Sequence, residues 1–193
     1  PRTSRALPRT ATTHTAICLT DMLTFKVKVP DNLVISAQDA ADAAAFGVTE
    51  LITQHLRDRN ASSTHRAGFP KSDYWADAAD SVQMSVSGSK ATVTLEKEGG
   101  ALHYGGGTVY PKKKALAIPL DPVVADIWPS EAGGELDVFW PKNASHGFLK
   151  DPETSDLLWL LVPKATIPAD RTVLPEDAAI EQAALDAIWG ACA

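Results

Sequence analysis

Five histidines are the first residues to consider for chemistry, because imidazole binds metals and exchanges protons near neutral pH. No two of them stand four residues apart, the spacing that puts two zinc ligands on one face of a helix. The two cysteines, Cys18 and Cys192, lie near opposite ends of the chain. The histidines are His14, His55, His65, His103 and His146. The sequence therefore predicts two free thiols and no metal site.

Catalytic motifs are equally sparse. No Gly-x-Ser-x-Gly segment places a serine on a strained turn, so a hydrolase would need a triad assembled from distant residues. The glycines Gly105, Gly106 and Gly107 are not followed by the Gly-Lys-Ser/Thr of a phosphate-binding loop, and no Gly-x-Gly-x-x-Gly opens a helix. We therefore expect no catalytic residues and no cofactor, with a hydrolase as the less favoured alternative.

The glycine triplet and the lysines that follow it suggest binding. Consecutive glycines indicate that the backbone bends at Gly105–Gly107, or that another segment approaches it closely; a bulge at a sheet corner is the simplest case. Lys112, Lys113 and Lys114 follow Tyr110 closely in an otherwise acidic chain. These four residues are either a solvated loop tip or a docking loop for an acidic partner or nucleic acid.

Composition limits the function classes. The formal net charge is −6 and the pI is near 5.3, which argues against general nucleic-acid binding but not against a local basic patch. An apolar fraction of 45% with 22% charged residues is typical of a globular protein. The longest apolar run, Leu157–Val162, has six residues, too few for the roughly 18 that cross a membrane, and predicts a buried strand.

The elements that would position these residues are helices and antiparallel strands. Residues 23–29 alternate apolar and polar side chains, as a half-buried strand does. Ser36 is a suitable N-cap for a long helix that reaches about Arg57, whose alanine-rich first half could contact the core or another subunit. Further strands are expected at about 82–87, 91–97, 136–140 and 157–162, with helices at 73–80 and from Pro175.

The expected fold class is α+β: antiparallel hairpins packed against a long N-terminal helix and a C-terminal helix. The segments on either side of the three lysines are expected to form a bent strand pair. Residues 22–193 should make a single domain. Residues 1–21, which contain three arginines and one acid, are either an extended N-terminal arm or a leader preceding a natural start at Met22.

Two segments resemble the Mu-type phage virion morphogenesis, or tail completion, family. The first runs Gly-Gly-Gly-Thr-Val-Tyr-Pro-Lys over residues 105–112 and continues as Lys-Ala-Leu-Ala-Ile-Pro over residues 114–119. The second is Ile167-Pro168-Ala169, ahead of the final helix. Asp170-Arg171 stands where the family usually has Arg-Pro, and a long insert, about residues 121–156, lies between the two motifs. The resemblance spans roughly residues 22–190.

The resemblance implies a structural virion protein without enzymatic activity. It would form a ring, expected to be a hexamer, at the tail–head junction of a tailed bacteriophage. Its partners would be further copies, the tail-tube protein and the neck or connector proteins; DNA could pass transiently through the lumen, and no membrane is involved. The chain would be found in the virion, and in the host cytoplasm during assembly. The alternative is a tail terminator or a head-side stopper of the neck.

Overall fold

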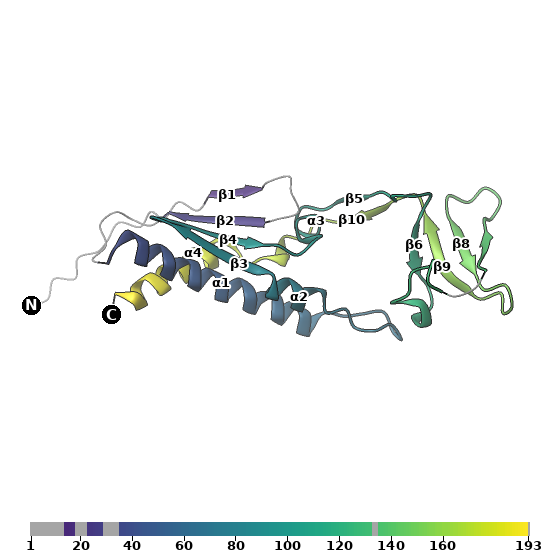
Figure 1. The fold of residues 1–193 in the computed structure, drawn as a ribbon, viewed down its shortest axis with the longest axis horizontal. Coiled ribbons are helices and arrows are strands. Elements are labelled where there is room, and N and C mark those ends of the chain that lie inside the picture. The colour runs from purple at the N-terminus through teal and green to yellow at the C-terminus, as the bar shows by residue number, and fades with distance from the viewer. Residues whose placement is uncertain (1–13, 18–22, 29–34, 133–134, 193) are drawn as a thin grey trace, which may run out of the picture. The chain divides into compact units, whose positions relative to one another are not determined.

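The computed structural model describes residues 14–17, 23–28, 35–132 and 135–192. Their contacts group into two compact units, considered separately below. The first, called the α+β unit, comprises the described parts of Pro1–Ser62, Asp73–Tyr104 and Asp170–Ala193. The second, called the β unit, comprises Ser63–Ser72 and the described parts of Gly105–Ala169. Figure 1 shows the elements of each.

An antiparallel sheet of four strands forms one layer of the α+β unit. The strand order is β1 (His14–Ile17), β2 (Leu23–Lys28), β4 (Lys90–Leu95) and β3 (Val82–Ser87). The β3–β4 hairpin turns at Gly88, whose φ of 58° is one that glycine adopts readily. Both the first strand after Met22 and this hairpin are predicted from the sequence and confirmed.

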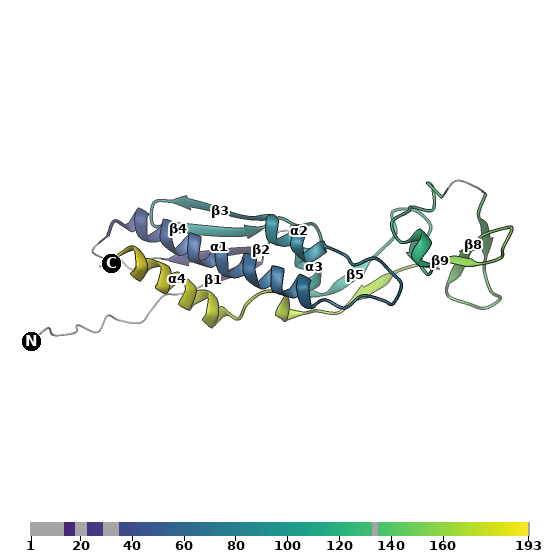
Figure 2. The same cartoon turned by 90° about the horizontal axis from the view of Figure 1, so that it is seen from below.

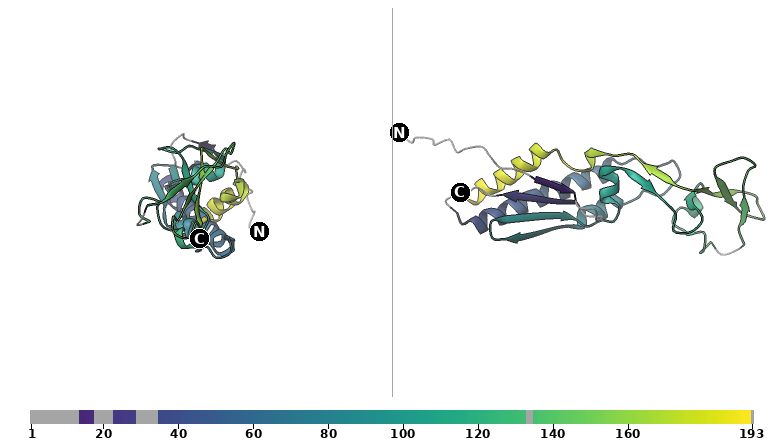
Figure 3. Two further views of the ribbon diagram at one scale, coloured as in Figure 1. Left: turned by 90° about the vertical axis from the view of Figure 1, so that its right-hand side faces the viewer. Right: turned by 90° about the horizontal axis from the view of Figure 1, so that it is seen from above.

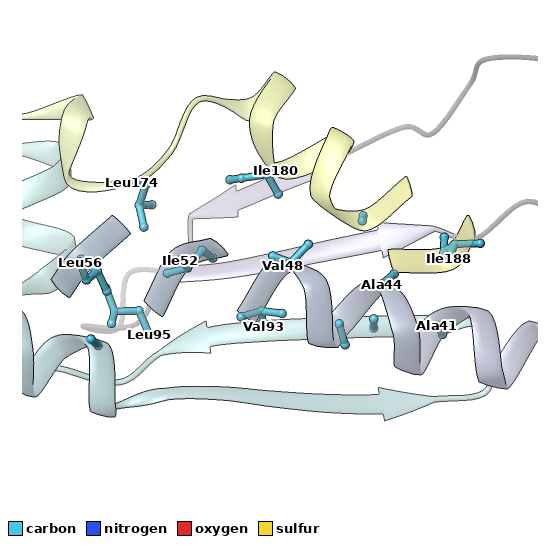
Figure 4. Close-up of a cluster of buried hydrophobic side chains, with 14 of the residues drawn as sticks. Ala41, Ala44, Val48, Ile52, Leu56, Val93, Leu95, Leu174, Ile180 and Ile188 are labelled. Carbon is cyan, nitrogen blue, oxygen red and sulfur yellow. The ribbon is translucent and has the colours of Figure 1, made fainter. Parts of the chain in front are cut away.

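Helix α1 (Ala37–Ser62) packs on one face of this sheet, against β3 and β4. Ser36 caps it: the Ser36 hydroxyl accepts a hydrogen bond from the Asp39 amide at 3.1 Å and donates one to the Asp39 carboxylate at 2.6 Å. One face of α1 is buried, and Figure 4 shows several of its apolar side chains directed at the sheet and at α4. The alanine-rich half therefore faces the core. The buried residues are Ala40, Ala41, Ala44, Ala45, Val48, Ile52 and Leu56.

The C-terminal helix α4 (Asp177–Ala191) lies alongside α1, as Figure 2 shows, and buries Ile180, Ala184 and Ile188. Viewed from the other side, the strands lie in front of α1 (Figure 3, right). The short helices α2 (Tyr74–Asp80) and α3 (Gly100–Gly105) and the 3-10 helix η2 (Arg171–Val173) complete the unit. An antiparallel sheet packed against the N-terminal helix α1, with the C-terminal helix α4 alongside α1, confirms the predicted α+β class.

The β unit contains a two-stranded ribbon and a second antiparallel sheet. The ribbon pairs β5 (Gly107–Val109) with β10 (Ala165–Ile167). The sheet has the order β6, β9, β8, β7, and a 3-10 helix, η1, covers Pro122–Val124. Its strands are β6 (Leu116–Pro119), β7 (Asp137–Phe139), β8 (Gly147–Lys150) and β9 (Leu157–Val162).

Two predictions for this unit are wrong. The strands that flank the three lysines do not pair with each other, because β5 pairs with β10 and β6 with β9. Strand β9 is not fully buried: Trp159 is buried, whereas Leu157 is exposed and its other residues are intermediate. No helix of the described β unit other than the short η1 is available to cover its sheet, so the apolar run keeps partial contact with solvent.

The division into two units was not foreseen either. The chain passes between the units four times, and one crossing, Tyr104 to Gly105, coincides with the glycine triplet that the sequence analysis interpreted as a bend and not as a boundary between units. Each unit is built from several separate segments of the chain, and such units need not fold independently. The single domain over residues 22–193 therefore stays a prediction. Of residues 1–21, the described stretch is β1, which pairs with β2.

Candidate functional site

The three lysines of the expected docking loop lie between β5 and β6 in the β unit. Lys112, Lys113 and Lys114 are exposed, and Tyr110 exposes 67% of its surface. None of these lysines forms an ion pair within the described residues. The segment therefore presents one aromatic ring and three positive charges that the described part of the chain leaves uncompensated.

Lys113 and Lys114 also border a shallow groove of about 510 Å³. Its other lining residues are apolar and come from β6, β8, β9 and a nearby loop. They are Ala115, Ala117, Pro129, Leu149 and Leu161. An apolar floor beside two ammonium groups suits an acidic, partly apolar segment rather than a small charged ligand.

The glycine triplet makes a tight backbone junction at one end of β5. Gly106 has a φ of 70°, and a Cβ there would lie 2.6 Å from the Ala169 amide nitrogen and 3.1 Å from the Ile167 carbonyl oxygen. Gly105 ends α3, and Gly107 begins β5. At Gly106 the backbone therefore both bends and lies close to another segment, Ile167–Ala169. This position comes directly before the β5–β10 ribbon, and β5 leads to the three lysines.

Most of the large apolar side chains that the described chain exposes belong to the β unit. Nine of the twelve exposed ones belong to it, whereas the large apolar residues it buries are Val124 and Trp159. Water contact of this extent at so many large side chains is unfavourable. The nine are Tyr110, Ile118, Val123, Ile127, Trp128, Val138, Phe139, Trp140 and Leu157.

Part of this surface is an ordered aromatic cluster on the β7–β8 hairpin. The Phe139 and Phe148 rings stack with centroids 6.3 Å apart and an interplanar angle of 23°. The His146 ring meets Phe148 edge-on at 5.4 Å. Phe139 nevertheless exposes 47% of its surface, and it lies on β7, an edge strand of the sheet. The rings are therefore positioned before any partner arrives.

Trp140 is fixed beside this cluster. Its indole nitrogen donates a hydrogen bond to the Ala144 carbonyl at 3.1 Å, which closes the β7–β8 connection. The indole ring also lies against Gly147, where any Cβ would overlap it. Half of the Trp140 surface remains exposed (50%), so the ring is held by one face and presents the other. Oriented tryptophans of this kind are typical anchors of protein interfaces.

A polar network in the α+β unit joins the end of α1 to the segment before α4. Arg59 forms an ion pair with Asp170, donates hydrogen bonds to the Thr172 carbonyl at 3.1 Å and hydroxyl at 3.0 Å, and stacks over Trp75 at 4.6 Å. The Thr172 hydroxyl, which donates to Asp170 at 2.6 Å, and Arg59 lower the pKa of the Asp170 carboxyl. These contacts hold the end of α1 to Asp170 and Thr172, and they engage both terminal nitrogens of Arg59.

The histidines occupy separate environments. The ring of His55 hydrogen-bonds the Thr172 carbonyl at 2.9 Å, His103 packs at 5.1 Å from Tyr74 in the α+β unit, and His65 is exposed. The described residues contain no group of three or more histidines, cysteines or acids able to hold a metal ion. Cys192 is a free, exposed thiol; the side chains of Cys18 and His14 lie outside the described residues. No helix in the described segments is both long and apolar enough to cross a bilayer.

Comparison with protein-family models, curated proteins and solved structures finds no match to this chain.

Proposed function

We propose that this chain is a structural virion protein of a tailed bacteriophage, a ring-forming tail-completion or neck subunit that joins the tail tube to the head. The observation that carries the proposal is the exposed aromatic surface of the β unit, in which nine large apolar side chains are exposed and two are buried. The phage assignment comes from the family resemblance of residues 105–119 and 167–169.

The energetics favour a binding role for this surface. Covering a large apolar side chain contributes about 1.5–3 kcal/mol, and a few tryptophan and tyrosine anchors carry most of the energy of an interface. Trp128, Trp140 and Tyr110 are exposed by 71%, 50% and 67%. Copies of a ring subunit and the tail proteins would cover them together, which suits a protein that is assembled permanently.

The three lysines would contact an acidic surface of a neighbouring copy or of the tail-tube or connector proteins, or DNA that passes the lumen. Charges at the rim of an interface mainly steer association and set its orientation. The predicted mechanism is therefore docking: the lysines orient the subunit and the aromatic rings hold it, without any covalent step.

The test is complementation of a phage that lacks this gene. The triple variant K112E/K113E/K114E should fold normally and fail to join tails to heads, leaving tailless heads beside finished tails in electron micrographs. The matched control is K71E/K142E/K164E, because these three lysines are also exposed in the β unit and form no described ion pair. It should restore normal particles.

Two other outcomes redirect or end the proposal. Overlong tails in the absence of the protein would identify a tail terminator instead of a completion protein. Normal particles from the K112E/K113E/K114E variant would remove the lysines from docking, and normal particles from the gene deletion would end the virion role.

A further inference from the structure

A second exposed apolar surface lies on the α+β unit. Asp42, Phe46 and Glu50 are spaced four residues apart and so form one stripe along α1. With Met84 of β3 they line a groove of about 760 Å³. Phe46 exposes 59% and Met84 50% of its surface. Figure 2 shows α1 with β3 on one side and α4 on the other. The remaining lining residues are Ala43, Gly47, Ala183 and Ala187.

The charge around this groove has a single sign. Asp42 and Glu50 form no ion pair with any described residue, and Asp42 accepts a side-chain hydrogen bond from Gln38 at 3.2 Å. Residues 35–56 of the α1 region and 172–193 of the α4 region contain no lysine or arginine. An occupant of the groove must therefore be positively charged and offer an apolar or aromatic group to Phe46 and Met84.

The Tyr110–Lys114 segment of the β unit has this combination. It offers Tyr110, which exposes 67% of its surface, and three exposed lysines without a described acidic partner. Pro111 limits the backbone freedom that binding would cost. The groove and the segment thus complement each other in charge and in apolar character, and each copy of the chain carries both.

We propose that the Tyr110–Lys114 segment of one copy docks in the Asp42–Phe46–Glu50 groove of a second copy. Such a contact joins two different surfaces, so it repeats from copy to copy and closes into a ring when the rotation permits. The inference rests on the proposed ring-forming function and specifies how neighbouring subunits meet. One short segment covers less surface than a standard interface, so the contact alone is weak and depends on salt.

Charge exchange tests the pairing in the full-length chain. Sedimentation of the wild type should show self-association that rises with concentration and weakens as salt increases. K112E/K113E/K114E and D42K/E50K should each lower the association constant by tenfold or more, and a mixture of the two variants should restore association. The control E96K/E98K changes two exposed acids of the same unit that do not line the groove and should associate like the wild type.

A photo-crosslinking residue at position 110 tests the location. The expected product has twice the chain mass, with the crosslink mapped to residues 42–50, Met84 or 183–187 of the other copy. Crosslinks to another region or within one chain, a wild type that remains monomeric up to its solubility limit, or failure of the mixed variants to associate would each overturn the inference.

The two proposals fail separately. If D42K/E50K associates normally while K112E/K113E/K114E still blocks tail joining, the lysines dock on tail or neck proteins and the proposed function stands without the loop–groove contact. If the crosslink maps to the groove while the gene deletion gives normal particles, the copy–copy contact stands and the neck role falls.

Discussion

Replacing Gly47 with alanine tests how closely α1 and α4 pack. A Cβ at Gly47 would lie 2.6 Å from the Ala187 Cβ and 2.7 Å from the Ala183 carbonyl oxygen. Carbon atoms prefer separations of about 3.5–4.0 Å, so one helix would have to move by about 1 Å. Neither contacted atom belongs to a flexible side chain, and the displacement must therefore involve the whole of α4.

The magnitude follows from two opposing effects. Overpacking a well-filled contact costs about 1–3 kcal/mol. Alanine in place of glycine inside a helix recovers about 0.5–1 kcal/mol through backbone entropy. The overpacking cost exceeds the recovery, so we expect Gly47→Ala to lower the free energy of unfolding by about 1–2 kcal/mol. For a chain of this size that corresponds to a Tm about 2–8 °C lower.

Urea unfolding followed by circular dichroism measures this difference. Gly190→Ala is the matched control, because Gly190 is also helical, has no positive φ, and a Cβ there meets nothing within 4 Å. It should leave stability unchanged or raise it by up to about 1 kcal/mol. A Gly47→Ala variant as stable as the wild type, or more stable, would refute the close packing of the two helices.

Two further predictions concern single residues. In the folded state the Thr172 hydroxyl and Arg59 lower the pKa of Asp170. The ionised carboxylate therefore contributes to the free energy of unfolding above the pKa that Asp170 has in the unfolded chain, and this contribution is lost as the pH falls through its pKa in the folded chain. Asp170→Asn should therefore lower the free energy of unfolding at neutral pH. The difference from wild type, measured by urea unfolding, should become smaller in acid. A difference that does not change with pH would show that ionisation of Asp170 does not contribute to stability. Gly106→Ala should cost about 1–3 kcal/mol, because a positive φ and a backbone contact both oppose a side chain. Gly105→Ala, where a Cβ meets nothing within 4 Å, should be close to neutral in the same measurement.

Local periodicity was enough to locate the main elements of the α+β unit. The alternation after Met22, the Ser36 cap and the turn at Gly88 are all signals that act over a few residues, and β2, α1 and the β3–β4 hairpin follow from them. The partners of β5 and β6 depend on segments 40 or more residues away, β10 and β9. Short strands contain no information that selects one distant partner over a nearer one.

The candidate site also contains features that local sequence predicts and features that depend on distant segments. The lysine cluster and the glycine junction are visible in sequence because their residues are consecutive. The groove on α1 is visible only in part: the four-residue spacing of Asp42, Phe46 and Glu50 puts them on one stripe, but the stripe becomes a groove through Met84 and α4. The Arg59–Asp170 ion pair joins residues 111 positions apart, and nothing in either local sequence indicates it.

Tryptophan shows why sequence alone leaves the binding role open. Trp159 is buried in the β unit and Trp75 packs against the core of the α+β unit, whereas Trp128, Trp140 and Trp189 are at least half exposed. A core and a permanent interface use the same residue types, so the residue type alone does not separate the buried tryptophans from the exposed ones. Exposed Trp189 lies on α4 itself, so the two units do not divide the tryptophans, but they differ in cover: α1 and α4 pack in the α+β unit, and the only helix of the described β unit is the short η1. The apolar run of β9 therefore lacks the cover that a buried strand has, and this is the strongest physical reason behind the proposal that the β unit binds a partner.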